Sequence, residues 1–125
     1  MAIDEKQLQA LIDRAAISEV QIRYATGVDM RDWALYRSCF TDEIETDFSS
    51  AGGTTPQRMK ADDWVEYARR TINGMKATQH MITNHVITLD GDEATDTVRT
   101  TKIGEQVSLP SASGGAFTAN ESLDL

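Results

Sequence analysis

Two long strand patterns joined by a tight turn constrain the fold most strongly. Residues 77 to 89 predict a long strand, and Asp90-Gly91 is a dipeptide typical of hairpin turns. A partner strand is expected from about Ala94 to Ile103, and residues 117 to 125 predict a further strand after a loop at 110 to 115. The second half of the chain is therefore expected to form long antiparallel strands.

The first half begins with helical periodicity. From Asp4 to about Val28, apolar residues recur at the spacing of one helix face, and Asp4 with Gln7 resembles a capping box. A short second helix is expected from Trp33 to Phe40, and a third from Asp62-Asp63 to about Gly74. The expected buried side of the third helix carries Trp64, Val65, Tyr67, Ala68, Thr71 and Ile72.

One strand is expected between the second and third helices. Residues 43 to 48 alternate strictly, which predicts a half-buried strand with the acids Glu43, Glu45 and Asp47 on its solvated face. Ser49 to Pro56 is expected to be a loop. Two helices, a strand, a helix and then long strands give an α+β order, with a curled sheet over the helices.

Composition limits the class of protein. The length of 125 residues, 40% of them apolar, predicts a single domain over residues 1 to 125. A net charge of −8 without a basic stripe argues against nucleic acid and anionic membranes as partners. The single cysteine, Cys39, excludes an internal disulfide and a cysteine-cluster metal site, and it is expected to be buried. The N-terminus lacks the order of a signal peptide, so the expected location is the cytoplasm.

The two histidines lie close together on the first long strand. On a regular strand, His80, Ile82 and Asn84 share one face and His85 points to the other. Opposite faces argue against a shared metal ion, and His85 is expected to have a structural or interface role. Asn84 is an ambiguous polar group for a pocket.

A candidate acid/base set combines His80 with two residues at the end of the first helix. Asp29 is a carboxylate that would orient the imidazole, and the Tyr24 phenol would donate a hydrogen bond. Each residue also has a structural interpretation. In this interpretation, His80 is a hydrogen-bonded structural residue in the sheet. Asp29 caps the turn that follows its helix, and Tyr24 is a core residue. Arg99 is a weak further candidate, because the strand register there is uncertain.

Several segments together carry a family resemblance. They are Leu11 to Ile17, Arg23 to Asp29, Arg31-Asp32-Trp33, Thr78-Gln79-His80, Asn84-His85 and the turn Asp90 to Ala94. The combination, over residues 8 to 101, resembles SnoaL-like proteins of the NTF2-like superfamily. The resemblance implies a cone in which a curved, mostly antiparallel sheet wraps around N-terminal helices and encloses a pocket.

The family includes scytalone and bile-acid dehydratases, a lindane dehydrochlorinase, polyketide cyclases, ketosteroid isomerase and small subunits of ring-hydroxylating dioxygenases. In its dehydratases, a helix-end aspartate pairs with a strand histidine that acts as a base, and an earlier tyrosine assists the leaving group. Asp29, His80 and Tyr24 occupy these positions. The resemblance therefore implies a lyase or isomerase that uses neither cofactor nor metal and acts on a small apolar ring or polyketide-like compound. The expected substrate-binding residues are Asn84, Ile82, Val28, Phe48 and Trp64.

The resemblance weakens towards the C-terminus. The segment after Gly104 matches less well, and the family's last strand is expected to be absent, which predicts a C-terminally short domain with an open sheet edge. We expect such a chain to form a homo-oligomer, either a dimer or a trimer. The alternative function is a non-catalytic binding or assembly domain, such as a dioxygenase small subunit.

Overall fold

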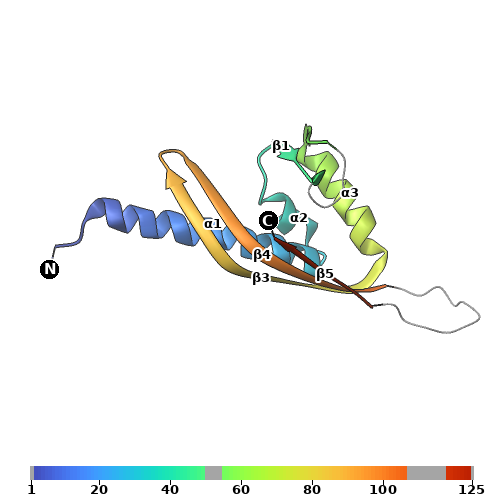
Figure 1. Ribbon diagram of the computed structural model, residues 1–125. Coiled ribbons are helices and arrows are strands. Elements are labelled where there is room, and N and C mark those ends of the chain that lie inside the picture. Colours follow the sequence, from blue (N-terminus) through green and yellow to red (C-terminus); the bar gives the residue numbers. More distant parts are fainter. Residues whose placement is uncertain (1, 50–54, 107–117, 125) are drawn as a thin grey trace, which may run out of the picture.

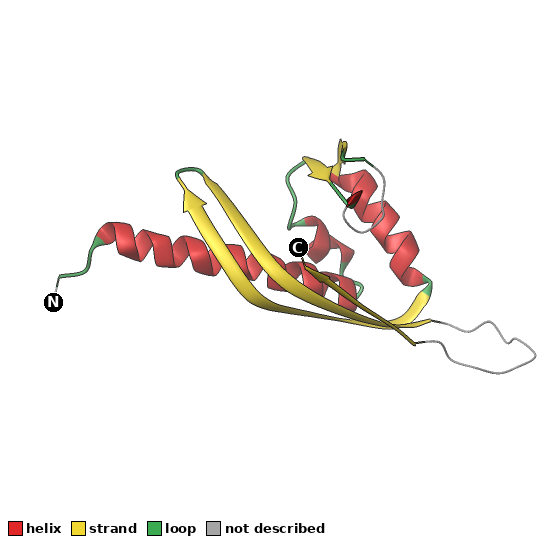
Figure 2. Cartoon of the chain, in the orientation of Figure 1, coloured by secondary structure: helices red, strands yellow, loops and turns green. Residues whose placement is uncertain are grey.

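The computed structural model describes residues 2–49, 55–106 and 118–124. Two helices, two strands, a helix and three strands follow one another in an α+β order, which confirms the predicted fold class (Figures 1 and 2). The elements are α1 (Glu5–Asp29), α2 (Trp33–Arg37), β1 (Glu43–Thr46), β2 (Gln57–Lys60), α3 (Ala61–Asn73), β3 (Met75–Asp90), β4 (Glu93–Gln106) and β5 (Thr118–Asp124).

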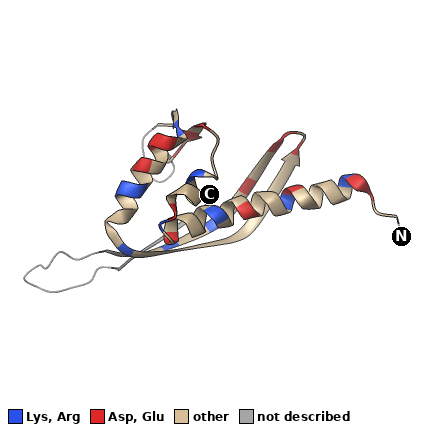
Figure 3. Ribbon diagram, turned by 180° about the vertical axis from the view of Figure 1, so that it is seen from behind, with Lys and Arg blue, Asp and Glu red and all other residues tan. Residues whose placement is uncertain are grey.

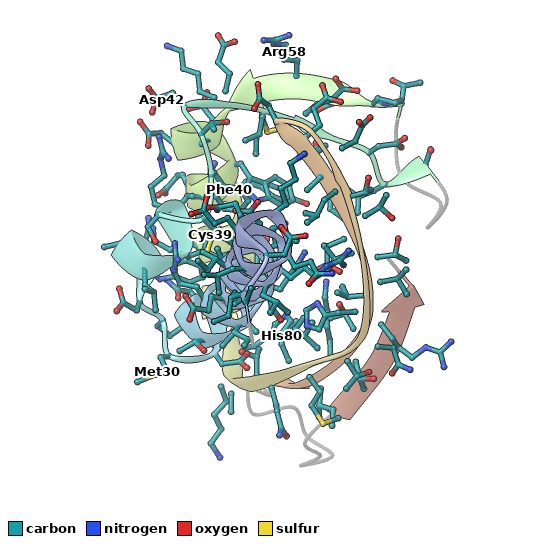
Figure 4. All side chains as sticks on the ribbon, turned by 90° about the vertical axis from the view of Figure 1, so that its left-hand side faces the viewer. Met30, Cys39, Phe40, Asp42, Arg58 and His80 are labelled. Atoms are coloured by element: carbon teal, nitrogen blue, oxygen red, sulfur yellow. The ribbon has the colours of Figure 1, made fainter. Side chains whose placement is uncertain are left out.

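The large sheet has the strand order β3-β4-β5, with both pairs antiparallel. Gly91 forms the tight turn between β3 and β4 with φ +57°, a backbone conformation that glycine adopts without strain. The sheet curves around α1, so its inner face meets the helix (Figure 4). This arrangement is the predicted cone of a curved sheet wrapped around N-terminal helices.

A β-bulge interrupts β3 between the two histidines. Thr83 pairs with Arg99 and Val86 pairs with Thr97, so β3 contains one residue more than β4 over this interval. Asn84 occupies the bulge with φ +57°, a conformation that asparagine tolerates better than most residues. The bulge exchanges the two faces of β3 for every residue that follows it.

The core lies where the end of α1 meets α2 and α3. Val28, Tyr36, Val65 and Ala68 are buried there, and aromatic side chains pack around them. A Cβ atom on Gly27 would lie 2.8 Å from the backbone nitrogen of Tyr36, so only glycine permits this approach of α2 to α1. Cys39, just after α2, is partly rather than fully buried; its thiol hydrogen-bonds to two backbone carbonyls, and burial raises its pKa.

Three predictions about the elements need correction. The strand β2, which pairs with β1, was not predicted. The apolar face of the first helix is not covered throughout, because α1 projects beyond the hairpin and Leu11 is 66% exposed (Figure 1). Tyr67 and Thr71 of α3 are also exposed rather than buried. The predicted loop at 110 to 115 lies outside the described residues.

Candidate active site

The end of α1 and the middle of β3 bring Asp29 and His80 into contact. His80 Nδ1 lies 2.6 Å from Asp29 Oδ1, and the His80 side chain is only 5% exposed. With a carboxylate as its partner, Nδ1 carries the hydrogen and donates it, which leaves the lone pair of the neutral ring on Nε2. The predicted contact between the two residues is therefore present.

Two further donors hold the Asp29 carboxylate. The His80 backbone N–H donates to Oδ2 at 2.7 Å, and the Thr78 hydroxyl donates to Oδ1 at 3.0 Å. A carboxylate in the last turn of a helix lies at the unfavourable, negative end of the helix dipole. These hydrogen bonds offset that repulsion and fix the carboxylate beside the imidazole.

Arg31 stabilises this arrangement through hydrogen bonds to the residues around Asp29 and His80. Its guanidinium donates to the Thr78 hydroxyl oxygen at 2.8 Å and to the backbone carbonyls of Val28 at 2.8 Å and Met75 at 3.2 Å. Arg31 has φ +58°, an uncommon conformation for a residue other than glycine. The side chain thus ties the end of α1 to the start of β3. Sequence analysis did not assign Arg31 or Thr78 a role at the site.

Tyr24 lies on α1, five residues before Asp29, in an aromatic cluster. Its ring centroid is 4.9 Å from that of Tyr36, whose hydroxyl oxygen accepts a hydrogen bond from Trp64 Nε1 at 3.0 Å. Burial raises the pKa of Tyr24, and its hydrogen bond with Tyr36 reduces this increase. Burial likewise raises the pKa of Tyr36. Both phenols therefore keep their protons at neutral pH and are able to donate.

A cavity of about 730 Å³ opens between the helices and the inner face of the sheet, and His80 lies in its wall. Five residues of its lining are aromatic: Tyr24, Tyr36, Phe48, Trp64 and Tyr67. Of the expected substrate-binding residues, Val28, Phe48 and Trp64 line this cavity, whereas Ile82 and Asn84 do not. Lys102, which sequence analysis overlooked, also lines it.

The bulge corrects the predicted faces of the two histidines. Asn84 is exposed at the bulge, and His85, not Asn84, shares the inner face with His80 and Ile82. His85 Nδ1 lies 2.8 Å from Asp96 Oδ2, and Nε2 lies 3.4 Å from the Ser18 hydroxyl of α1. The position of His85 between α1 and β4 agrees with the structural role expected for it.

Within the described part of the chain, no cluster of three or more histidine, cysteine or acidic side chains is suited to hold a metal ion. The same residues form no helix that is both long and apolar enough to cross a membrane.

Comparisons with known proteins agree with this architecture. The family model of the SnoaL-like domain matches residues 9–118. The Kfla4162 protein from Kribbella flavida is 32% identical in sequence, with a TM-score of 0.71 over 92% of this chain and 79% of that protein. A Novosphingobium aromaticivorans protein with the provisional name aromatic ring hydroxylase is 31% identical, with a TM-score of 0.62 over 90% of this chain and 75% of that protein.

A second Novosphingobium aromaticivorans protein, provisionally named scytalone dehydratase, is 16% identical and is similar in fold alone. Its TM-score is 0.62 over 92% of this chain and 72% of that protein. No functionally curated protein matches the chain. The match to the family model over most of the sequence shows that the chain belongs to the SnoaL-like domain family.

Proposed function

We propose that this SnoaL-like protein is a lyase or isomerase that acts without a cofactor on a small ring compound, with His80 as the general base. The observation that carries the proposal is the Asp29–His80 hydrogen bond at the wall of an aromatic cavity. An imidazole is suited to proton transfer near neutral pH, and a carboxylate on Nδ1 makes Nε2 the basic atom.

The proposed reaction begins when His80 Nε2 removes a proton from a carbon next to a carbonyl group. Asp29 stabilises the imidazolium that forms. In a dehydration, the C–H electron pair forms the new double bond as the neighbouring C–O bond breaks. The leaving hydroxyl takes the Tyr24 proton and departs as water, and the proton on His80 then restores the phenol through solvent. In an isomerisation, His80 returns the proton to another carbon, and Tyr24 hydrogen-bonds the enolate oxygen.

The cavity wall supports a ring-shaped ligand. Phe48 and Trp64 stack with their ring centroids 5.7 Å apart, and Tyr67 lies at the same distance from Trp64. Flat aromatic walls favour flat, apolar ligands over extended polar ones. The provisional name of the 31% identical relative, an aromatic ring hydroxylase, also concerns a ring compound.

Self-association is part of the proposal. Leu8, Leu11 and Ile12 of α1 are exposed close together in sequence, and exposed apolar side chains in a group indicate a contact surface. Light scattering during size-exclusion chromatography is the measurement, and a dimer or trimer is the expected species. A monomer at micromolar concentration would contradict this part of the proposal. The same surface is the observation that favours the alternative, a non-catalytic assembly domain.

Proton abstraction is testable before the natural substrate is known. The protein is incubated in deuterium oxide with a panel of cyclic ketones and β-hydroxy ketones, and mass spectrometry follows deuterium uptake and loss of water. We expect wild-type protein to accelerate exchange for at least one compound. His80→Gln should lower that rate by about 10² to 10⁴-fold. The matched variant His85→Gln should keep it within about twofold.

Two results would contradict the proposal. One is the absence of exchange across the whole panel, as expected of an assembly domain. The other is equal loss of exchange in His80→Gln and His85→Gln when both variants remain folded by circular dichroism.

A further inference from the structure

The inner face of β4 presents one cation to the cavity. Lys102 pairs in register with His80 on β3, and paired residues of antiparallel strands project to the same face. Their Cβ atoms are therefore about 5 Å apart. Lys102 and the proposed base both line the cavity.

The charge of this cavity differs from that of the whole chain. The protein has a net charge of −8, yet the cavity-lining residues within the described ranges include no aspartate or glutamate. Acidic residues instead gather at the tip of the β3–β4 hairpin and in the first turn of α3 (Figure 3). Lys102 is the only lysine or arginine among the described lining residues.

Lys102 is half-buried, and the described side chains provide it with no carboxylate partner. Placing a charged group away from water without a partner costs free energy, so such a group in a ligand cavity indicates that the ligand supplies the counter-ion. Its register partner on β5 is Glu121, which the experiment below includes as a competing explanation.

We propose that Lys102 binds an anionic oxygen group of the substrate, and that the substrate is therefore a ring compound with a carboxylate. This inference rests on the proposed function, because it concerns the same cavity. Lys102 would hold the carboxylate on the β4 side while His80 faces the carbon that loses its proton. The aromatic wall formed by Phe48 and Trp64 would receive the ring.

The test is a binding comparison that does not depend on catalysis. Isothermal titration calorimetry measures the affinity of 2-naphthoate and of 2-naphthamide, which has nearly the same shape but no charge, and of benzoate and benzamide as smaller analogues. We expect wild-type protein to bind at least one acid about tenfold more tightly than its amide. Lys102→Met should remove this preference while leaving amide affinity within about twofold.

Three variants make the comparison specific. Lys6→Met removes an exposed lysine at the start of α1 and should leave the preference for acids over amides unchanged. His80→Gln should abolish proton exchange and keep the preference, so that failure of the proposed function and failure of this inference are distinguishable. Glu121→Gln should leave the preference within about twofold.

The outcomes that overturn the inference are equally definite. They are equal binding of acids and amides by wild-type protein, binding of none of the four compounds, and a preference that survives in Lys102→Met. A preference that appears only in Glu121→Gln would assign Glu121 as the partner of Lys102 and would also overturn it.

Discussion

The two histidines of the β3–β4 hairpin each contact an aspartate, and the surroundings of the two Asp–His pairs differ. In the first, Asp29 and His80 join α1 to β3 at the wall of the aromatic cavity. In the second, Asp96 and His85 join β4 to β3 where the hairpin packs on α1. Both place a carboxylate oxygen within 2.8 Å of the Nδ1 atom of the histidine.

The difference lies at the other nitrogen and at the carboxylate. In the second pair, the Ser18 hydroxyl lies 3.4 Å from His85 Nε2, whereas no described side chain is hydrogen-bonded to His80 Nε2. The Asp29 carboxylate accepts hydrogen bonds from three donors. The Asp96 side chain is 4% exposed, and its buried Oδ1 atom has no hydrogen-bond partner among the described residues. The same two residue types therefore leave Nε2 without a described hydrogen-bond partner at one site and place it beside a hydroxyl at the other.

The largest contrast is expected in proton exchange. Asp29→Asn should lower the exchange rate of a responsive cyclic ketone by roughly 10²-fold or more, because the amide no longer fixes the tautomer and the imidazolium loses its counter-ion. Asp96→Asn should leave the rate within about twofold. Mass spectrometry of deuterium uptake provides both values. A similar loss in both variants would show that the two pairs are not functionally distinct.

The second contrast concerns stability. Asp29→Ala leaves the Thr78 hydroxyl and two His80 N–H groups without their acceptor, at about 1 to 3 kcal/mol for each group that stays buried and unpaired. Asp96→Ala leaves only His85 Nδ1 without its acceptor. Urea denaturation should therefore give a greater loss of unfolding free energy for Asp29→Ala. The opposite order would mean that the Asp29 hydrogen bonds contribute little to folding.

A smaller contrast tests the helix packing that forms the cavity. Gly27→Ala places a methyl group 2.8 Å from the Tyr36 backbone nitrogen, so the helices must separate, at about 1 to 3 kcal/mol. The matched variant Gly74→Ala meets its first neighbour at 3.5 Å and should cost less than about 1 kcal/mol. Thermal melting compares the two variants. Equal melting temperatures would show that the approach of α2 to α1 is adjustable.

Sequence periodicity predicted the long elements, and residue chemistry together with the family resemblance predicted the Asp29–His80 contact. Features that depend on tertiary contacts were missed. The strand β2 has a single apolar residue, Met59, among Gln57, Arg58 and Lys60, so no alternation was visible. Its strand conformation depends on pairing with β1. The positive φ of Arg31 and the hydrogen bonds of its side chain to α1, β3 and the Ile72 carbonyl of α3 likewise have no local sequence signal.

The misassigned face of His85 has a signal that was available. Ile82 is an apolar residue at an even position, whereas Ile87 and Leu89 are at odd positions, and Asn84 lies between them. A change of parity across an asparagine indicates a bulge, since strand faces alternate with a period of two. Assuming a regular strand placed Asn84 in the pocket and His85 outside it.

The central claim is that Asp29 holds His80 with Nε2 as its available basic atom. Nitrogen NMR of protein labelled with ¹⁵N-histidine tests it directly, because the chain has two histidines and His85→Gln leaves the signals of one. The account predicts that neutral His80 carries its hydrogen on Nδ1, and that Asp29→Asn changes this distribution. A neutral His80 with its hydrogen on Nε2, unaffected by Asp29→Asn, would contradict the account.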